Sequence, residues 1–452
     1  MNSQKIRLSH PIQCTVFPPG SKSVTNRALI CAALSNGATQ LNNALDSEDT
    51  QVMLEALRML ELSVQHDKKQ STMTVTGHGG TFPNASAEIY VGNSGTTARF
   101  LTATLAAAQN CRYRIYGKPR MHERPIGDLL AALKQLGADV QSETKNNCPP
   151  VLIGGQGTFG GSATVNGNIS SQFLSALLLA APISDSGVVL QVNGDLVSKP
   201  YIQMTLEVMR AFGVYVNAAE DFSRFTVNGH YNIPAGQLFE YDIEPDASAA
   251  SYFFSAAAIT RGSATVPNLT EKSLQGDIDF CRLLEQMGCR VKFDSASTTV
   301  IGGETLCGIT ADMNAVSDTV MTLGVTALFA KGTTRITNVA HIRHKETDRI
   351  TALAKELRKF GAAVEEWEDG LAITPPSAFP EGKIAIDTYD DHRMAMSFAI
   401  AGLNIPNVEI NDANCVAKTY PKFFDDLDAI IVPKSIPIAN SVFIPKGTTG
   451  DA

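Results

Sequence analysis

The sequence lacks the patterns that would place a chain of this length among metal-binding, disulfide-bonded or membrane proteins. Its eight cysteines are scattered without CxxC or Cys/His spacing, which favours reduced thiols over disulfides or zinc. No apolar run is long enough to span a membrane, and the stretch MNSQKIRLSHPIQC has no apolar signal core. We therefore expect a cytoplasmic protein with no metal, no cofactor and no membrane partner.

Net positive charge and complete nucleotide-binding motifs are also missing. The formal net charge of −8 argues against nonspecific nucleic-acid binding. GSKS at residues 20–23 resembles part of a P-loop, but residues 15–19 contain no glycine. GNSGTT at residues 92–97 lacks the GxGxxG spacing. Both nucleotide-fold interpretations are rejected.

What the sequence does contain is a repeat of about 75 residues, seen six times. In each copy a helix rich in Leu and Met ends and a short apolar strand begins. The ends of five copies lie 76, 76, 75 and 73 residues apart, at Glu61, Gly137, Gly213, Gly288 and Gly361, and a sixth closes near Asp428. A second class of helix, rich in Ala and Ser, alternates with the first, and helices so poor in charge are mostly buried. Its expected N-caps are Ser21, Ser94, Ser170, Asp246, Ser317 and Asp390.

The length of 452 residues predicts two domains, and six units divide into three plus three. The seam is expected near residues 236–246, where the strand of the third unit ends, with a second crossing at FPPGS, residues 17–21. The N-terminal strand IQCTVF would then join the other domain. We expect a first domain over residues 18–240, a second over 1–17 plus 241–433, and a loosely held tail over 434–452.

Basic residues recur at the starts of the expected buried helices, although the protein is acidic. If the units pack in parallel, several helix N-termini meet at one end of each domain, with unpaired N–H groups and partial positive charge. Together with Lys and Arg, they predict a site for a ligand that carries several phosphate or carboxylate groups. The basic residues are Lys22, Arg27, Arg99, Arg120, Arg124, Lys199, Arg343, Lys345, Arg349, Arg393 and Lys418.

Candidates for acid–base chemistry are Asp318, Glu346, His392 and the pair Asp390/Asp391. Asp318 could equally be a structural carboxylate in the first turn of a helix. Glu346, between Lys345 and Arg349, could equally form a surface ion pair, which contributes little to stability. For SSQ at residues 170–172, ordinary helix capping and contact with a ligand are equally good interpretations.

Nine blocks, in order from about Pro18 to Leu427, resemble the 5-enolpyruvylshikimate-3-phosphate synthase family. They read PPGSKSVTNRALICAAL, GNSGTTARF, GKPRMHERPIG, NISSQFLSALLLAAP, GDLVSKPYIQMTLEVM, EPDASAASYFF, HKETDRI, DTYDDHRMAMSFAI and AKTYPKFFDDL. The resemblance implies an α/β fold of two similar inside-out α/β barrel domains, each of three repeated βαβαββ units. It also implies transfer of the enolpyruvyl group of phosphoenolpyruvate to the 5-hydroxyl of shikimate 3-phosphate, without a metal or a covalent enzyme adduct.

Site roles follow from the resemblance position by position. Asp318 resembles the base for the 5-hydroxyl proton, Glu346 the group serving C3, and Lys22 a further catalytic residue. Contacts to shikimate 3-phosphate are implied for Lys22, Ser23, Arg27, Ser170, Ser171, Gln172, Ser198, Tyr201, Asp318, His341 and Lys345. Contacts to phosphoenolpyruvate are implied for Lys22, Gly95, Arg124, Gln172, Glu346, Arg349, His392, Arg393 and Lys418.

Two positions depart from the family pattern. His341 stands where relatives often carry Asn, and Phe100 where they often carry Pro, behind Gly95. In the resembling family the phosphoenolpyruvate pocket, which Gly95 is expected to line, also accepts glyphosate in competition with phosphoenolpyruvate. Gly95→Ala is therefore expected to weaken glyphosate more than the shorter substrate.

Three alternatives accompany this interpretation. A family that transfers enolpyruvyl to UDP-N-acetylglucosamine generally carries a reactive Cys in the loop that matches residues 117–125, and GKPRMHERP has none. A noncatalytic phosphate-binding module would need the basic clamp but not Asp318 and Glu346. An RNA-end-processing relative is disfavoured by the acidic net charge. Small-molecule substrates, no nucleic acid and a monomer are expected.

Overall fold

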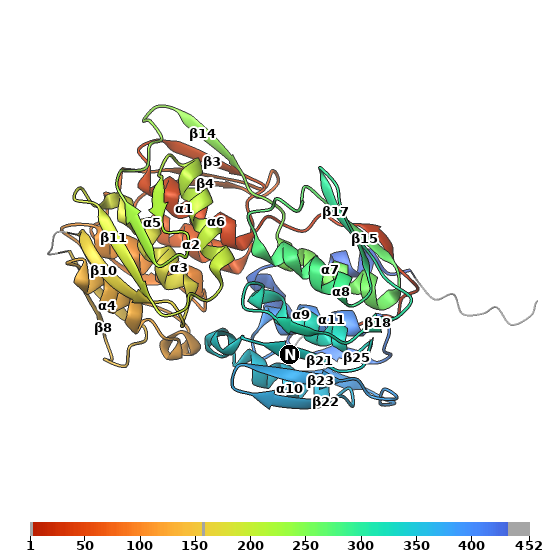
Figure 1. Cartoon of the computed structure of the whole chain (residues 1–452). Coiled ribbons are helices and arrows are strands. Elements are labelled where there is room, and N and C mark those ends of the chain that lie inside the picture. Colours follow the sequence, from red (N-terminus) through yellow and green to blue (C-terminus); the bar gives the residue numbers. More distant parts are fainter. Residues whose placement is uncertain (1–2, 156–158, 433–452) are drawn as a thin grey trace, which may run out of the picture.

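The computed structural model describes residues 3–155 and 159–432, so the expected tail at 434–452 lies outside the described residues. Figure 1 shows two bodies of helices and sheets, one red to yellow-green and the other green to blue. Each has its own core of buried apolar residues. One core runs from Val24 to Ile243, and the other joins Ile6, Ile12 and Val16 to residues 247–427. We call these bodies the first half and the second half.

Three four-stranded sheets build the first half, and all share one order of pairing. A parallel pair comes first and two antiparallel pairs follow. In spatial order the strands are β14 (Leu238–Asp242), β3 (Ala38–Asn42), β5 (Thr72–Thr76) and β4 (Ser63–Asp67); β6 (Ser86–Tyr90), β7 (Arg112–Tyr116), β9 (Val151–Gly154) and β8 (Asp139–Ser142); and β10 (Gly161–Asn166), β11 (Val188–Asn193), β13 (Arg224–Val227) and β12 (Val216–Ala218). The strand expected to end the third unit, β14, instead lies beside β3 in the first sheet.

The second half repeats this order in two four-stranded sheets. They contain β2 (Gln13–Thr15), β15 (Ser263–Pro267), β17 (Ser297–Ile301) and β16 (Arg290–Phe293); and β19 (Thr310–Asp312), β21 (Thr334–Thr337), β23 (Gly370–Thr374) and β22 (Ala363–Trp367). A three-stranded sheet has β24 (Ile384–Ile386) parallel to β25 (Val408–Ile410) and β25 antiparallel to β1 (Gln4–Lys5). A short parallel pair joins β18 (Leu306–Cys307) to β20 (Ala330–Lys331).

Six helices poor in charge are almost entirely buried, which confirms that expectation. Only Ser23 and Gln172 among their residues are not buried, because most of their side chains are small or apolar. The few charged side chains, Lys22, Arg27, Arg99 and Arg393, are buried as well and lie in the first two turns of their helices. The helices are α1 (Lys22–Leu34), α3 (Gly95–Ala107), α5 (Ser171–Ala180), α7 (Ala247–Thr260), α9 (Val320–Ala327) and α11 (His392–Ala401). In Figure 1, α7, α9 and α11 lie between the sheet that contains β15 and β17 and the sheet that contains β21–β23.

The alternate helices are amphipathic or short, and the residues predicted to punctuate them lie just beyond their ends. These helices are α2 (Glu48–Met59), α4 (Gly127–Gln135), α6 (Lys199–Ala211), α8 (Phe280–Gln286), α10 (Arg349–Arg358) and α12 (Phe423–Ala429). The punctuating residues Glu61, Gly137, Gly213, Gly288 and Gly361 all have φ between 61° and 106°. A left-handed residue ends a helix, and glycine adopts that conformation most readily.

The N-cap predictions hold for four helices and fail for two. Ser21, Ser170 and Asp246 cap α1, α5 and α7 with side-chain hydrogen bonds, and Ser94 occupies the N-cap position of α3 without one. The cap of α11 is Asp391, whose carboxylate accepts the Arg393 amide at 2.9 Å, one residue after the predicted Asp390. Ser317 instead opens a 3₁₀ turn, and α9 starts only after Thr319. The 3₁₀ turns are η1 (Pro119–Glu123), η2 (Ala181–Ile183), η3 (Gly276–Asp279), η4 (Ser317–Thr319), η5 (Ala340–His344) and η6 (Ala413–Lys418).

Two chain segments run side by side where the chain passes between the halves. Gly20 bridges Pro245, and the Ser21 amide donates to the Glu244 carbonyl at 2.8 Å. The Lys22 amide donates to the Asp246 side chain at 3.1 Å, so the starts of α1 and α7 are tied together. Only glycine fits at position 20, because a Cβ there would lie 1.8 Å from the Asn43 carbonyl oxygen.

All eight cysteines lie within the described residues and carry free thiols. Across residues 3–155 and 159–432, no helix is long and apolar enough to cross a membrane. In the same ranges, no group of three or more His, Cys, Asp or Glu side chains is placed to hold a metal ion.

Candidate active site

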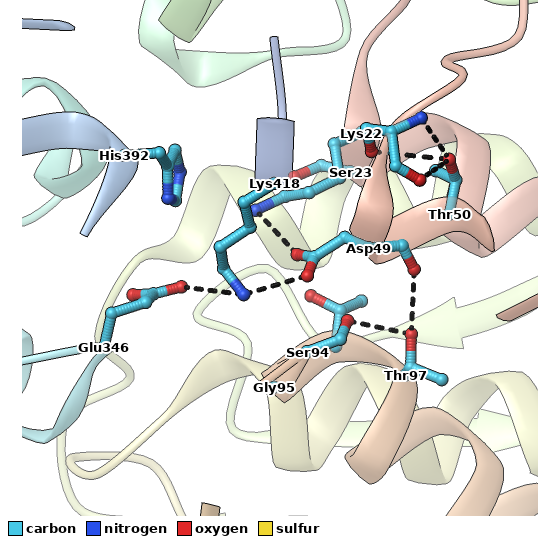
Figure 2. A network of polar contacts seen from close by, with 12 residues as sticks. Lys22, Ser23, Asp49, Thr50, Ser94, Gly95, Thr97, Glu346, His392 and Lys418 are labelled. Atoms are coloured by element: carbon cyan, nitrogen blue, oxygen red, sulfur yellow. Dashed lines mark hydrogen bonds and ion pairs between the residues drawn. The ribbon is translucent and has the colours of Figure 1, made fainter. Parts of the chain in front are cut away.

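A buried ionic network joins the two halves. Asp49, in the first turn of α2, accepts a hydrogen bond at 2.8 Å from Lys418 Nζ at the end of η6, and its other oxygen lies 3.6 Å from Lys22 Nζ at the start of α1. Lys418 Nζ also donates to the Asn93 carbonyl at 2.9 Å and lies 3.8 Å from Glu346 Oε1. Figure 2 shows Lys418 between Asp49 and Glu346. The network therefore connects lysines and carboxylates from both halves.

Arg349, the first residue of α10, is the buried cation around which the carboxylates of the second half gather. Its guanidinium contacts three carboxylates: Asp391 at 2.7 Å, Glu346 at 2.8 Å and Asp318 at 3.2 Å. Its side chain is 1% exposed. Burial opposes the charged form, but these carboxylates raise the pKa of Arg349 above its ordinary value. Arg349 is thus a fixed cation, and the predicted ion pair between it and Glu346 is buried rather than on the surface.

Asp318 and Glu346 are both held in the ionised form. Asp318 Oδ2 accepts a hydrogen bond at 2.7 Å from Arg393, and Asp318 Oδ1 lies 4.0 Å from Lys345 Nζ. Burial favours neutral carboxyls, but Arg393 and Lys345 outweigh it and hold the pKa of Asp318 well below its usual range. Arg349 and other cations do the same for the pKa of Glu346. Ionised carboxylates can accept protons, so both residues can serve as bases.

His392, the first residue of α11, is fully buried, and within the described residues neither ring nitrogen has a hydrogen-bond partner. Its Nδ1 lies 3.7 Å from Asp391 Oδ1. Burial and the nearby Arg393 hold the pKa of His392 well below 6.5, so the ring is neutral. Figure 2 shows the ring on the side of the network where Lys418 and Glu346 meet. A neutral ring of this kind offers one donor and one acceptor to a ligand.

Gly95 opens α3 against two arginines. Arg124 Nη1 donates to the Asn93 carbonyl at 2.9 Å, and Arg99 donates to the carbonyls of Gly95 and Pro125 at 3.2 and 2.9 Å. Burial lowers the pKa of Arg124. A Cβ on Gly95 would lie 2.4 Å from Arg124 Nη2, so a methyl group there meets a guanidinium rather than open space.

Arg27 carries a buried charge with neutral partners only. Its guanidinium donates to the hydroxyls of Thr205 and Ser175 at 2.8 and 3.3 Å and to two backbone carbonyls, and the described residues place no carboxylate within ion-pair range of it. Burial lowers the pKa of Arg27 to about 10. The ring of Phe100 lies 5.3 Å from the guanidinium carbon. Phe100 thus packs against Arg27, and it is not among the atoms closest to a Cβ placed on Gly95.

Most of the remaining predicted residues lie at the starts of α5 and α6 and in η5. Ser170 caps α5 by accepting the Gln172 amide at 3.2 Å. Ser198 Oγ lies 3.3 Å from His341 Nε2 across the boundary between the halves. Burial and Lys345 lower the pKa of His341 to about 3, so this departure from the family pattern adds a neutral side chain. Ser23 is partly exposed, and its carbonyl accepts from Arg27.

Further contacts hold the halves together around the site. Arg120 donates to the backbone carbonyls of Glu346 and Lys345 at 3.2 and 3.3 Å. Lys118 Nζ lies 3.6 Å from Asp390 Oδ2, so Asp390 faces solvent while Asp391 serves the site. A cleft of about 680 Å³, lined in part by Arg120, Arg124 and Glu346, leads to the network. By contrast, the cavity bordered by Ser170, Ser171, Gln172, Ser198, His341 and Lys345 measures only about 20 Å³.

Tyr201 of the first half forms a hydrogen bond with a buried carboxylate of the second half. Its hydroxyl donates to the Asp277 carboxylate at 3.2 Å, and Ser248 Oγ donates to the same group. Burial and the charge of Asp318 raise the pKa of Asp277 to about 7. Asp277 and Asp49 are two buried acidic residues of the site that were not predicted from the sequence. Each lies in a short acidic stretch at the start of a helix, where no pattern separates a buried carboxylate from an exposed one.

Known proteins resemble this chain along most of its length. The profile of the family described as EPSP synthase (3-phosphoshikimate 1-carboxyvinyltransferase) matches residues 6–427. A 3-phosphoshikimate 1-carboxyvinyltransferase from Trichormus variabilis is 46% identical over 420 residues, which cover 92% of this chain and 96% of that protein. One from Photobacterium profundum is 46% identical over 438 residues, covering 96% and 100%.

Solved structures give the same result at lower identity. An EPSP synthase from Acinetobacter baumannii superposes with a TM-score of 0.75 at 25% identity, covering 95% of this chain and 98% of that one. The enolpyruvyl transferase NikO from Streptomyces tendae, at 18% identity and a TM-score of 0.74, shares the fold. The α/β fold and these relatives agree, and the chain belongs to the EPSP synthase family.

Proposed function

We propose that the buried cluster between the two halves is where this chain carries out the reaction of its family. The chain transfers the enolpyruvyl group of phosphoenolpyruvate to the 5-hydroxyl of shikimate 3-phosphate and releases phosphate, in the shikimate pathway to aromatic amino acids. Both substrates carry several negative charges. The observation that supports this location is the set of buried cations Arg349, Arg393 and Lys418 around the two ionised carboxylates Asp318 and Glu346. Lys22 of the first half joins them through Asp49, which it shares with Lys418.

The phosphoenolpyruvate subsite lies on the Glu346 side of the cluster in this proposal. Arginine forks suit phosphate and carboxylate groups, and the unpartnered ring of His392 can donate to a phosphate oxygen. The backbone at Gly95 brings Arg124 close to the helix start. The assigned residues are Lys22, Gly95, Arg124, Gln172, Glu346, Arg349, His392, Arg393 and Lys418.

Shikimate 3-phosphate is assigned to the side of the cluster formed by the starts of α1, α5 and α6. Arg27 supports this assignment most directly, because its buried charge has only neutral partners and is left for an anionic ligand. The assigned residues are Lys22, Ser23, Arg27, Ser170, Ser171, Gln172, Ser198, Tyr201, Asp318, His341 and Lys345.

Proton transfer in this proposal depends on charge neutralisation by the substrates. Asp318 takes the proton of the 5-hydroxyl, Glu346 serves C3, and Lys22 assists at the same centre. In the structure, cations hold the pKa values of Asp318 and Glu346 low, which makes them weak bases. Bound phosphates and carboxylates would engage those cations and allow both pKa values to rise toward values suited to general acid–base work, which is worth about 10²- to 10⁴-fold in rate.

The finer architecture is part of the same proposal. Five four-stranded sheets share one pairing order, and the buried helices alternate with the amphipathic ones. This supports six βαβαββ units in two inside-out α/β barrel domains, over residues 18–240 and over 1–17 plus 241–433. The seam falls within or just after β14. Because one chain supplies all the assigned residues, we propose a monomer, and the cytoplasmic location stays a prediction.

A phosphate-release assay tests the proposed function. Release should require both phosphoenolpyruvate and shikimate 3-phosphate and should need no added metal or nucleotide. Substitution of UDP-N-acetylglucosamine for shikimate 3-phosphate should give no release. Activity that is lost on chelation and restored by a divalent ion would contradict the proposal. Tight binding of both substrates without any phosphate release would instead favour the noncatalytic module.

A further inference from the structure

Asp49 is a buried carboxylate that has no assigned role in the reaction, yet it contacts two of the assigned lysines. Its side chain is 5% exposed, although it lies in the first turn of α2 beside the exposed Glu48. Lys418 Nζ is 2.8 Å from one of its oxygens and Lys22 Nζ is 3.6 Å from the other. Lys22 belongs to the first half and Lys418 to the second, so one carboxylate gathers cations from both.

Local structure fixes the position of Asp49. The Ser47 amide donates to Thr50 Oγ1 at 3.0 Å, which holds the first turn of α2 in place. The Asp49 carbonyl accepts from Thr97 Oγ1 at 3.5 Å, and that hydroxyl pairs with Ser94 Oγ at 2.9 Å. Figure 2 shows these contacts running from α2 to the start of α3. The turn that carries Asp49 is therefore tied to the turn at which Gly95 begins α3.

The contacts of Lys418 show what Asp49 does to it. An ammonium group has three protons. Two hydrogen bonds go to first-half acceptors, Asp49 Oδ1 and the Asn93 carbonyl at 2.9 Å, while Glu346 Oε1 lies 3.8 Å away on the other side. A lysine of the second half is thus oriented by acceptors of the first. It can take this position only when the halves are together.

We propose that Asp49 is a positioning residue for phosphoenolpyruvate: it holds the ammonium groups of Lys22 and Lys418 facing one anionic ligand, and so couples assembly of the anion clamp to contact between the halves. This inference rests on the proposed function, which assigns both lysines to phosphoenolpyruvate. A buried carboxylate paired with two cations contributes little net stability to the fold. The effect of Asp49 that matters is therefore that it fixes the positions of the two ammonium groups. When Asp49 loses its charge, the two like-charged lysines lose the carboxylate that they share, and Lys418 keeps only the more distant Glu346, at 3.8 Å.

The test compares Asp49→Asn with Glu48→Gln. Both changes remove one negative charge from the first turn of α2, so any effect through the helix dipole is shared. Glu48 is exposed and serves as the matched control. We expect Asp49→Asn to lower kcat/KM for phosphoenolpyruvate by about 10-fold or more and to raise KM for shikimate 3-phosphate by less, because only Lys22 of the two lysines is also assigned to that ligand. Glu48→Gln should stay within about 2-fold of the parent.

Asp49→Glu provides a second variant that keeps the charge and moves the carboxylate by one methylene group. It should also lower kcat/KM for phosphoenolpyruvate, because the distances to both lysines change. Parent-like kinetics in this variant would show that charge alone matters and would overturn the positioning role. A lower KM for phosphoenolpyruvate in Asp49→Asn would also overturn it, because Asp49 would then merely compete with substrate for the lysines.

Lys418→Met separates this inference from the proposed function. If Lys418→Met loses activity while Asp49→Asn does not, the proposed function stands and the inference fails. If Lys418→Met retains parental kinetics, the assignment of Lys418 in the proposed function fails. In the double variant, Asp49→Asn should cost less than it does in the parent, because its effect through Lys418 is already lost and only its effect through Lys22 remains. Additive losses would overturn the inference.

Discussion

Replacing Gly95 with Ala should damage the site by displacing an arginine, not by narrowing an empty pocket. The added Cβ would lie 2.4 Å from Arg124 Nη2 and 2.7 Å from Arg99 Nη1. Both side chains are buried, so neither guanidinium can swing freely into solvent. Arg124 would have to leave its position against Asn93, where it donates to the carbonyl at 2.9 Å and to Oδ1 at 3.2 Å.

The size of the effect follows from the contacts that Arg124 loses. A hydrogen bond made by a charged group contributes about 1.5–3 kcal/mol. Losing one equivalent contact to phosphoenolpyruvate would lower kcat/KM by about 10- to 150-fold. The helix itself should tolerate Ala, because Gly to Ala in a helix gains about 1 kcal/mol or less. This revises the expectation from sequence: KM for phosphoenolpyruvate and Ki for glyphosate should both rise, since both anions need Arg124.

The assay is steady-state phosphate release, with KM for phosphoenolpyruvate and Ki for glyphosate measured in four forms. These are the parent, Gly95→Ala, Arg124→Lys and the double variant. Lysine has no atom equivalent to Nη2, so the methyl group should cost much less in the Arg124→Lys background. An equal cost in both backgrounds would refute displacement of Arg124. So would a rise in Ki alone with KM unchanged.

Three further outcomes are expected. Asp318→Asn and Glu346→Gln should each lower kcat by about 100-fold or more with the far-UV circular dichroism retained, and near-normal turnover in either variant would remove that residue from proton transfer. The pKa of Asp277 is raised from 3.8 to about 7, so between these values the folded protein holds a proton that the unfolded chain has lost, and stability falls as pH rises. Asp277→Asn should therefore gain thermal stability relative to the parent as the pH increases from 4 to 8, and a constant difference in Tm would contradict this. Because the cavity beside Ser170 measures about 20 Å³, the free protein must open to admit shikimate 3-phosphate, and small-angle scattering should show a smaller radius of gyration with that ligand than without it.

The parts of the fold that depend on local signals could be predicted from the sequence. The left-handed residues that end the helices, such as Gly137 and Gly361, and the caps Ser21 and Asp246 carry their conformational preference in their own side chains. The pairing of β14 with β3 could not be predicted, because both are short strands and their partners lie far apart in the chain. Tertiary packing, and not the local sequence pattern, determines which strands become neighbours in a sheet.

The residues of the site also fall into some that could be predicted from the sequence and some that could not. The cations and the carboxylates Asp318 and Glu346 lie beside helix starts and could be named from the sequence, but the buried carboxylates Asp49 and Asp277 could not. Glu48 and Asp49 look alike in sequence, and only tertiary packing buries the second and exposes the first. Asp390 and Asp391 present the same ambiguity: the first is exposed, and the second is buried against Arg349. Burial of one member of an acidic pair is a property of the assembled halves.

The pairing of β2 with β15 also constrains how the chain folds during synthesis. Cys14 in β2 donates to the Ser263 carbonyl, 249 residues later in sequence. All of the first half, including β14, leaves the ribosome before β15 exists, so the first core can form while residues 3–17 still wait for a partner. Contacts between such distant segments form slowly, because the intervening chain must be ordered first. Until they form, β15 has an unpaired edge, and in the nascent second half that edge is the natural place for another chain to add.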